Sequence, residues 1–113
     1  MLRVARPSDV PALLELERAQ GICSRKFYAG FAAEVAAIKS ELDGLLRRLK
    51  EQGKSLAAYG AAAKGSTLLN YCGIGTELLE FVADGSTYKQ GRLMPGVHVP
   101  IVPPTQLLER APD

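Results

Sequence analysis

The sequence predicts an α/β fold, in which a Rossmann-like βαβ unit with a short parallel sheet follows a helical segment that contains one long helix. Up to Gly53, apolar residues recur at steps of three and four, which is the helical period. After Gly53, two short apolar runs at 55–59 and 78–84 enclose a helix-like stretch at 62–72. A strand, a helix and a strand at this spacing are typical of a parallel βαβ unit.

We therefore expect two parts, an N-terminal helical segment at residues 1–53 and a Rossmann-like unit at residues 54–113. The helical segment is expected to hold helices at about 9–20 and 24–52, each preceded by a capping serine or aspartate. At 1.5 Å per residue the second helix would span about 42 Å, which is longer than a domain of this size needs. It is therefore expected to reach a second copy or another domain, and Gly30 and Gly44 are the positions where it would break.

The C-terminal part is expected to supply two strands and a short helix at 106–110, with Thr105 as its cap. Between them, residues 85–104 are rich in glycine and proline and are expected to be irregular. Two parallel strands make a poor sheet, so we expect the sheet to be incomplete in this chain.

Composition excludes several classes of function. The chain has 113 residues with a net charge of +2, which is too weak to indicate nucleic acid or an anionic membrane as a partner. No apolar run approaches the roughly 20 residues of a membrane span, and the first residues lack a signal-peptide core, so a cytoplasmic location is expected. Cys23 and Cys72 are expected to be buried, reduced thiols, and with His98 as the single histidine no metal site is predicted.

The most informative segment is the predicted strand-to-helix turn at 59–67. Small residues from Gly60 to 63 would let a phosphate approach the first amides of the helix, and Lys64 adds a cation. The order of Lys64 and Gly65 does not match a P-loop, and Ala62 stands where the dinucleotide fingerprint has its second glycine. The alternative is that small residues merely allow the helix and the strand to pack closely, and the turn alone does not decide between the two.

Further candidates follow the second predicted strand. Asp84 ends that strand, where an acid binds ribose hydroxyls in Rossmann-type units, although aspartate is also a common turn residue. Lys89 and Arg92 offer charge for a phosphate. His98 is a candidate general base or a structural hydrogen-bonding group. No catalytic set of side chains can be assembled, so no catalytic residue is predicted.

Two blocks of this sequence together resemble a known family. The first is 59–74, YGAAAKGSTLLNYCGI, and the second comprises Asp84, KQGR at 89–92 and PGVHVPI at 95–101. They resemble the C-terminal domain of the SAM-dependent C-methyltransferases that act on nucleotide-linked deoxysugars. The resemblance covers most of the chain.

The resemblance implies a division of labour among domains. Full-length members have a small zinc-binding domain, a central SAM-binding domain with the catalytic base, and a Rossmann-like C-terminal domain that holds a nucleotide-sugar, typically a dTDP-linked ketosugar. It implies that this chain binds no cofactor itself, lacks the SAM site and the base, and works with a methyltransferase domain or chain; whether it is an enzyme alone is left open. The implied substrate-binding residues are Tyr59, Gly60, Ala61, Ala62, Lys64, Asp84, Lys89, Gly91, Arg92, Pro95, Gly96 and His98.

Two other interpretations remain open. The chain is alternatively a non-catalytic module that uses its long helix to form a homodimer or to dock on a methyltransferase. A third interpretation is a small α/β enzyme that uses His98 as a base.

Overall fold

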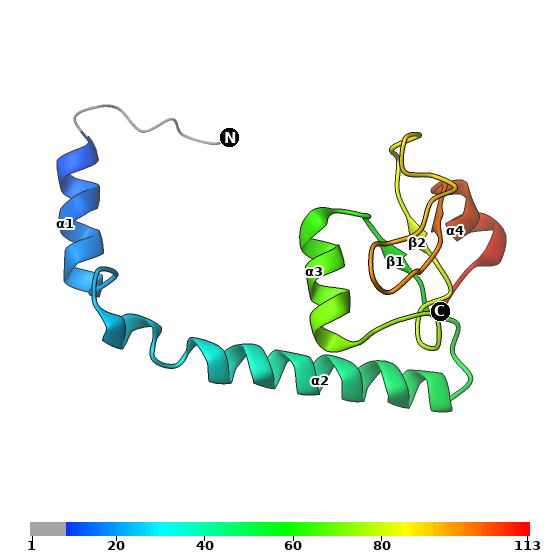
Figure 1. Ribbon diagram of the computed structural model, residues 1–113, viewed down its shortest axis with the longest axis horizontal. Helices are drawn as coiled ribbons and strands as arrows, with labels where there is room; N and C mark the ends of the chain where they lie inside the picture. Colours follow the sequence, from blue (N-terminus) through cyan, green and yellow to red (C-terminus); the bar gives the residue numbers. More distant parts are fainter. Residues whose placement is uncertain (1–8) are drawn as a thin grey trace. The chain divides into compact units, whose positions relative to one another are not determined.

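The computed structural model describes residues 9–113, which form four α-helices, one 3₁₀ helix and three strands (Figure 1). The chain divides into two compact units, with the boundary after Ala36. Helix α2, Phe31–Glu51, begins in the first unit and ends in the second.

The first unit contains α1, Val10–Gln20, and the 3₁₀ helix η2, Arg25–Tyr28. Gly21 ends α1 in the left-handed conformation that glycine favours, with φ of 74°. The Ser24 hydroxyl accepts a 3.3 Å hydrogen bond from the Phe27 amide, as expected for a cap. The prediction of one helix at 24–52 was wrong, because Ser24 caps only this short turn and α2 starts after Gly30. Gly44 lies inside α2 without breaking it.

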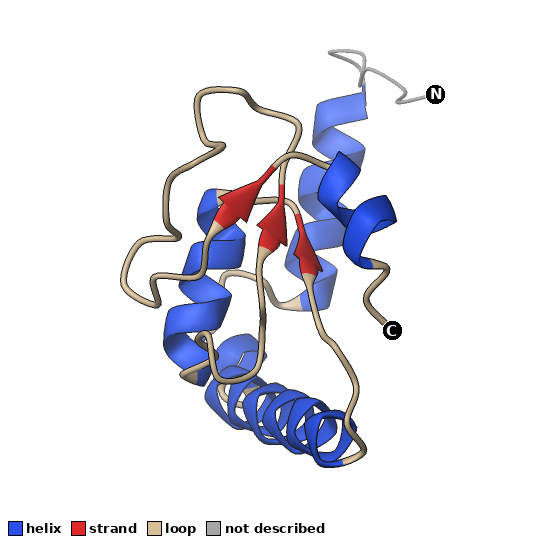
Figure 2. Cartoon of the chain, turned by 90° about the vertical axis from the view of Figure 1, so that its right-hand side faces the viewer, coloured by secondary structure: helices blue, strands red, loops and turns tan. Residues whose placement is uncertain are grey.

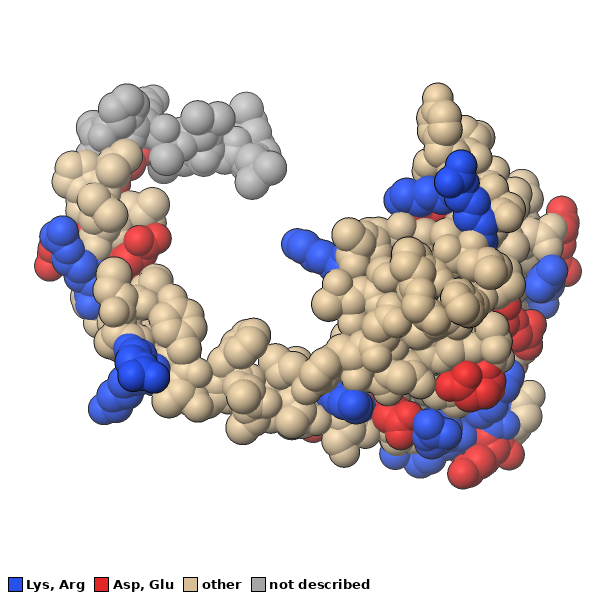
Figure 3. Space-filling model, in the orientation of Figure 1, with Lys and Arg blue, Asp and Glu red and all other residues tan. Residues whose placement is uncertain are grey.

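In the second unit, α2 lies against the core through the partly buried side chains of Leu42, Leu46 and Leu49. The helix ends with the Lys54 amide donating to the Leu49 carbonyl at 3.0 Å, next to Gly53 with φ of 78°. The space-filling view shows acidic and basic side chains interspersed around the C-terminal end of α2 (Figure 3).

The sheet has three parallel strands in the order β1, β2, β3 (Figure 2). They are β1, Ala58–Tyr59, β2, Val82–Ala83, and β3, Ile101–Val102. Helix α3, Ala63–Cys72, connects β1 to β2, so the α/β class and the βαβ unit were predicted correctly. The sequence predicted two strands and an irregular 85–104 segment, and both expectations missed β3.

The prolines beside β3, Pro100 and Pro103, argued against a strand in the sequence, because proline lacks the N–H that most strand positions need. Here the Pro100 carbonyl accepts the Val82 amide at 2.8 Å, and the Val102 carbonyl accepts the Asp84 amide at 3.0 Å. Pro100 therefore takes part in the pairing through its carbonyl oxygen, which proline retains.

The core of the second unit is apolar. Its largest fully buried side chains are Phe81, Ile74, Met94, Val82 and Val99. Cys72 is buried there, whereas Cys23 is exposed, so the prediction of two buried thiols was wrong for Cys23; both cysteines are free.

The C-terminal residues pack on the second unit. Helix α4, Thr105–Arg110, has Pro104 rather than Thr105 at its N-cap position, and the Arg110 guanidinium lies 5.1 Å from the centre of the Phe81 ring. Asp113 pairs with Lys54 at 2.8 Å and accepts the Ser55 amide at 3.0 Å. Within residues 9–113 no helix is long and apolar enough to cross a membrane, and no group of three or more potential metal ligands is found.

Candidate ligand-binding site

The turn between β1 and α3 is tightly packed. Gly60 has φ of 97°, and its amide donates to the Ala83 carbonyl at 2.7 Å. A Cβ at Gly65 would lie 3.4 Å from the Gly60 carbonyl oxygen, so the N-terminal end of α3 packs directly against the backbone of the preceding loop. Ala62 is the N-cap of α3 and provides no side-chain hydrogen bond, so the first amides of the helix have no side-chain cap. Both features that the sequence offered as alternatives are therefore present: α3 packs closely on the loop after β1, and the first amides of α3 have no side-chain cap.

Asp84 fastens this turn to the end of β2. Its Oδ2 accepts the Ala61 amide at 2.7 Å, and its Oδ1 accepts the Ser86 amide at 2.7 Å. The Ser86 hydrogen bond, followed by the Ala61 hydrogen bond and the charge of Lys89, lowers the pKa of the Asp84 carboxyl group below its ordinary value. Lys89 Nζ lies 3.5 Å from Oδ2, and the Asp84 side chain is 13% exposed. The acid that the sequence predicts as a sugar or ribose contact thus binds two backbone amides.

Residues 91–101 form a hairpin that ends in β3. The Ile101 amide donates to the Arg92 carbonyl at 2.8 Å, and the Met94 amide donates to the Val99 carbonyl at 2.8 Å. At the tip, His98 has φ of 58°, and its amide donates to the Met94 carbonyl at 2.9 Å.

The hairpin tip contacts α3 through Asn70. Asn70 Nδ2 donates to the Pro95 carbonyl at 2.8 Å and to the Ser66 carbonyl at 2.8 Å. A Cβ at Gly96 would overlap Asn70 Oδ1 and lie 2.8 Å from Cγ, so any other residue here would displace this amide.

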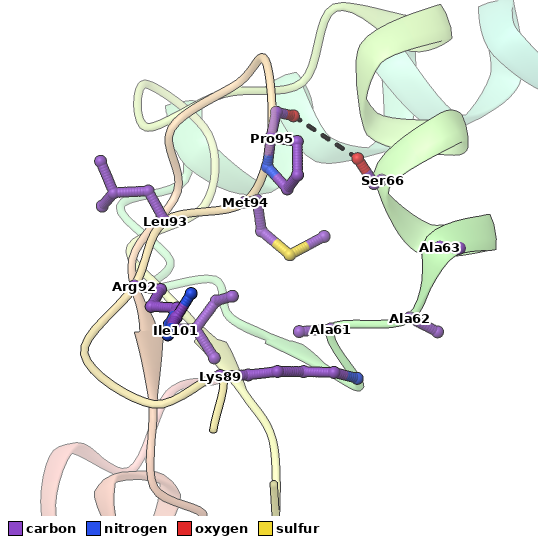
Figure 4. A pocket seen from close by; sticks show the side chains of 10 residues that line it. All are labelled: Ala61, Ala62, Ala63, Ser66, Lys89, Arg92, Leu93, Met94, Pro95 and Ile101. Atoms are coloured by element: carbon purple, nitrogen blue, oxygen red, sulfur yellow. Dashed lines mark hydrogen bonds between the residues drawn. The ribbon is translucent and has the colours of Figure 1, made fainter. Parts of the chain in front are cut away.

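Between the turn and α3 on one side and the hairpin on the other lies a pocket of about 380 Å³ (Figure 4). Its walls are mostly apolar, and its charged side chains are two cations, Lys89 and Arg92. In Figure 4 Lys89 extends toward the turn at Ala61. The pocket is lined by Ala61, Ala62, Ala63, Ser66, Lys89, Arg92, Leu93, Met94, Pro95 and Ile101. It lies at the carboxyl end of β1, where open α/β sheets bind ligands.

The structure brings some of the predicted residues to this pocket and leaves others outside its lining. Those that line it are Ala61, Ala62, Lys89, Arg92 and Pro95. Those that do not line it are Tyr59, Gly60, Lys64, Asp84, Gly91, Gly96 and His98. Among the latter, Tyr59, Lys64 and His98 are exposed, whereas Asp84 and Gly96 hold the walls in place.

The site prediction missed Leu93, Met94, Ile101 and the bridging Asn70, and its set of binding residues also lacks Ala63 and Ser66, which line the pocket from α3. A signal for the first three was present, because short apolar stretches flank Pro95 and Gly96, and such a pattern is typical of a hairpin. No comparable signal identifies Asn70, since its partners are 4 and 25 residues away and only the fold brings them together.

Comparison with known proteins confirms the resemblance. The family model of the C-methyltransferase C-terminal domain matches residues 3–113. The chain is 38% identical over 108 residues to C-methyltransferase NovU from Streptomyces niveus, an alignment that covers 96% of this chain and 26% of NovU. The chain thus spans about a quarter of the length of that relative. On both findings, this chain belongs to the C-methyltransferase C-terminal domain family.

Proposed function

We propose that the chain is the nucleotide-sugar-binding module of a SAM-dependent sugar C-methyltransferase. It holds a dTDP-type ketosugar in the pocket between α3 and the hairpin while a domain outside this chain transfers the methyl group. The proposed setting is deoxysugar biosynthesis in the cytoplasm. The proposal includes a Rossmann-like arrangement of the sheet and its helices.

The pocket is the observation that carries the proposal. Diphosphates need positive charge and hydrogen-bond donors, and Lys89 and Arg92 lie in the pocket beside the uncapped first turn of α3. Lys89 shares its charge with Asp84 at 3.5 Å, so Arg92 is the stronger candidate for the phosphate. The apolar side chains of Met94 and Ile101 offer a surface for the uncharged part of the ligand.

Three predicted residues that do not line the pocket have supporting roles in this proposal. Lys64 and Tyr59 are exposed near the turn, where they are placed to contact a bound ligand that extends beyond the pocket. Asp84 keeps the turn in place, and its remaining lone pairs leave room for a sugar or ribose hydroxyl.

The same pocket does not suit the methyl donor. S-adenosylmethionine carries a positively charged sulfonium, and the charged side chains that line the pocket are both cations. We therefore propose that the donor and the catalytic base belong to another domain.

Titration calorimetry of the chain with dTDP-glucose tests the proposal. Arg92→Ala should weaken binding about tenfold, because a charge-assisted hydrogen bond is lost. Arg48→Ala, which removes the same charge from the exposed part of α2, should leave binding unchanged. At a ligand concentration one hundred times Kd, unfolding should require about 2.7 kcal/mol more free energy. Absence of any binding at millimolar dTDP-glucose would overturn the proposal.

A second function is favoured by the first unit, where residues 9–36 bury no side chain. Its exposed apolar side chains include Leu13, Leu16, Phe27 and Phe31. The alternative function is therefore a docking or dimerising module. Light scattering distinguishes it from ligand binding. The docking function predicts that the chain self-associates or binds a methyltransferase chain, and that dTDP-glucose does not change this association.

A further inference from the structure

Asn70 connects the two walls of the pocket. It lies on α3 one turn after Ser66, which lines the pocket from the helix side. Its Nδ2 donates at 2.8 Å to the Ser66 carbonyl and at 2.8 Å to the carbonyl of Pro95, which lines the pocket from the hairpin side. A weaker 3.5 Å contact joins the Ser66 hydroxyl to the same Pro95 carbonyl. One amide group therefore fixes the hairpin wall to the helix wall.

The hairpin tip needs such an anchor. His98 holds φ of 58°, a conformation that costs a non-glycine residue free energy and persists only where the surroundings impose it. Gly96, with φ of 79°, lets the tip backbone lie directly against Asn70 Oδ1. The Asn70 side chain contacts the tip through both its oxygen and its nitrogen, so it fixes the orientation as well as the distance of the tip.

We propose that Asn70 is the positioning residue of this pocket: it holds Pro95 at a set distance from Ser66 and so keeps the pocket formed before the ligand arrives. The inference rests on the proposed function, since it assigns a role in binding at that same site. A preformed site binds more tightly because less of its ordering has to occur on binding.

Hydrogen exchange tests the anchor without a ligand. Asn70→Asp keeps the shape of the side chain but places an oxygen against the Pro95 and Ser66 carbonyls. The matched control is Thr67→Ala, which removes a 3.1 Å hydrogen bond to the Ala63 carbonyl from the same helix but does not affect the hairpin. We expect the amides of Met94 and His98 to exchange about fivefold to tenfold faster in Asn70→Asp alone, as the loss of one hydrogen bond implies. The Val82 amide, which donates to Pro100 at 2.8 Å, should exchange alike in all three proteins.

Binding of dTDP-glucose tests the consequence. Because Asp adds a negative charge near an anionic ligand, Asn70→Ala is measured beside Asn70→Asp. Both should bind about tenfold more weakly than the unmodified chain, while their melting temperatures stay close to that of Thr67→Ala. A purely structural role would leave Kd unchanged, even where the melting temperature falls.

Two results would overturn the inference. One is equal exchange of the Met94 and His98 amides in Asn70→Asp and the unmodified chain. The other is faster exchange with an unchanged Kd in Asn70→Ala. If the unmodified chain itself does not bind dTDP-glucose, the proposed function fails, and the exchange comparison still decides whether Asn70 holds the hairpin.

Discussion

Residues 9–36 and residues 37–113 both contain regularly spaced apolar residues, but only the second region buries them. In the first region no side chain is buried, and Leu13, Leu14 and Leu16 of α1 are 46–54% exposed. In the second, Phe81, Ile74 and Val99 are completely buried. Apolar periodicity therefore predicts where a helix forms and which face it would bury, but not what covers that face.

The difference has an energetic consequence. An isolated helix of 11 residues is marginal in water, because most helical stability in proteins comes from packing of the apolar face. The second region has such packing, and the first, within residues 9–36, does not. Substitutions in the two regions should therefore differ sharply in their cost.

The largest expected effect compares two phenylalanines. Phe81→Ala should lower the free energy of unfolding by about 3–5 kcal/mol, because it leaves a cavity in the core. Phe31→Ala, at a position 66% exposed, should change it by less than about 0.5 kcal/mol. Urea denaturation of the two variants measures both values, and losses of similar size would show that the first region has a core after all.

The next largest effect compares two glycines of the hairpin. Gly91 and Gly96 have φ of 78° and 79°, so alanine is strained at both positions, by about 1–2 kcal/mol. A Cβ at Gly91 meets nothing within 4 Å, whereas one at Gly96 overlaps Asn70. Gly96→Ala should therefore cost about 1 kcal/mol more than Gly91→Ala, through the lost Asn70 hydrogen bonds. Thermal denaturation of both variants measures the difference, and equal costs would mean that Asn70 moves aside freely.

Much of the fold was predictable from local signals. The helices at 10–20 and 63–72 and the parallel βαβ unit follow from caps, glycines and apolar spacing. The third strand was not predictable in this way, because Pro100 and Pro103 argue against a strand, and the pairing of the Pro100 carbonyl with Val82 arises only in the tertiary fold.

The site was predictable in part. The small residues Ala61 and Ala62 and the cations Lys89 and Arg92 were candidates because of their residue types, and all four line the pocket. The role of Asp84 as an anchor of the turn depends on the amide of Ala61, which is 23 residues earlier in the sequence. Contacts at such separation arise from the tertiary fold and have no local signature.

A smaller effect concerns pH and Asp84. Its pKa is lowered in the folded chain, so it contributes stability that is present above the ordinary value of 3.8 and is lost as the pH falls from there through the lowered folded value. Asp84→Asn should therefore be less stable than the unmodified chain at pH 7, with a difference that shrinks below pH 3.8. The control Asp43→Asn removes an exposed pair with Arg47 within α2, and it should cost less because such pairs are screened by solvent. Thermal denaturation between pH 2 and pH 7 checks both, and a difference for Asp84→Asn that grows in acid would contradict the assigned hydrogen bonds.

The smallest effect on stability is expected from a cut in the first region. Trypsin should cleave after Arg25 or Lys26 before it cleaves after Lys89 or Arg92, because η2 buries no side chain and the hairpin amides are hydrogen-bonded. Since residues 37–113 hold their own core, the cut chain should melt at nearly the same temperature as the intact one. Mass spectrometry identifies the first cut. Initial cleavage after Lys89 would contradict the prediction that the first region is the less protected one. If the docking alternative holds, adding a methyltransferase domain should slow the cut at Arg25 and leave cleavage at Lys89 unchanged, which identifies the first region as the surface that a partner covers.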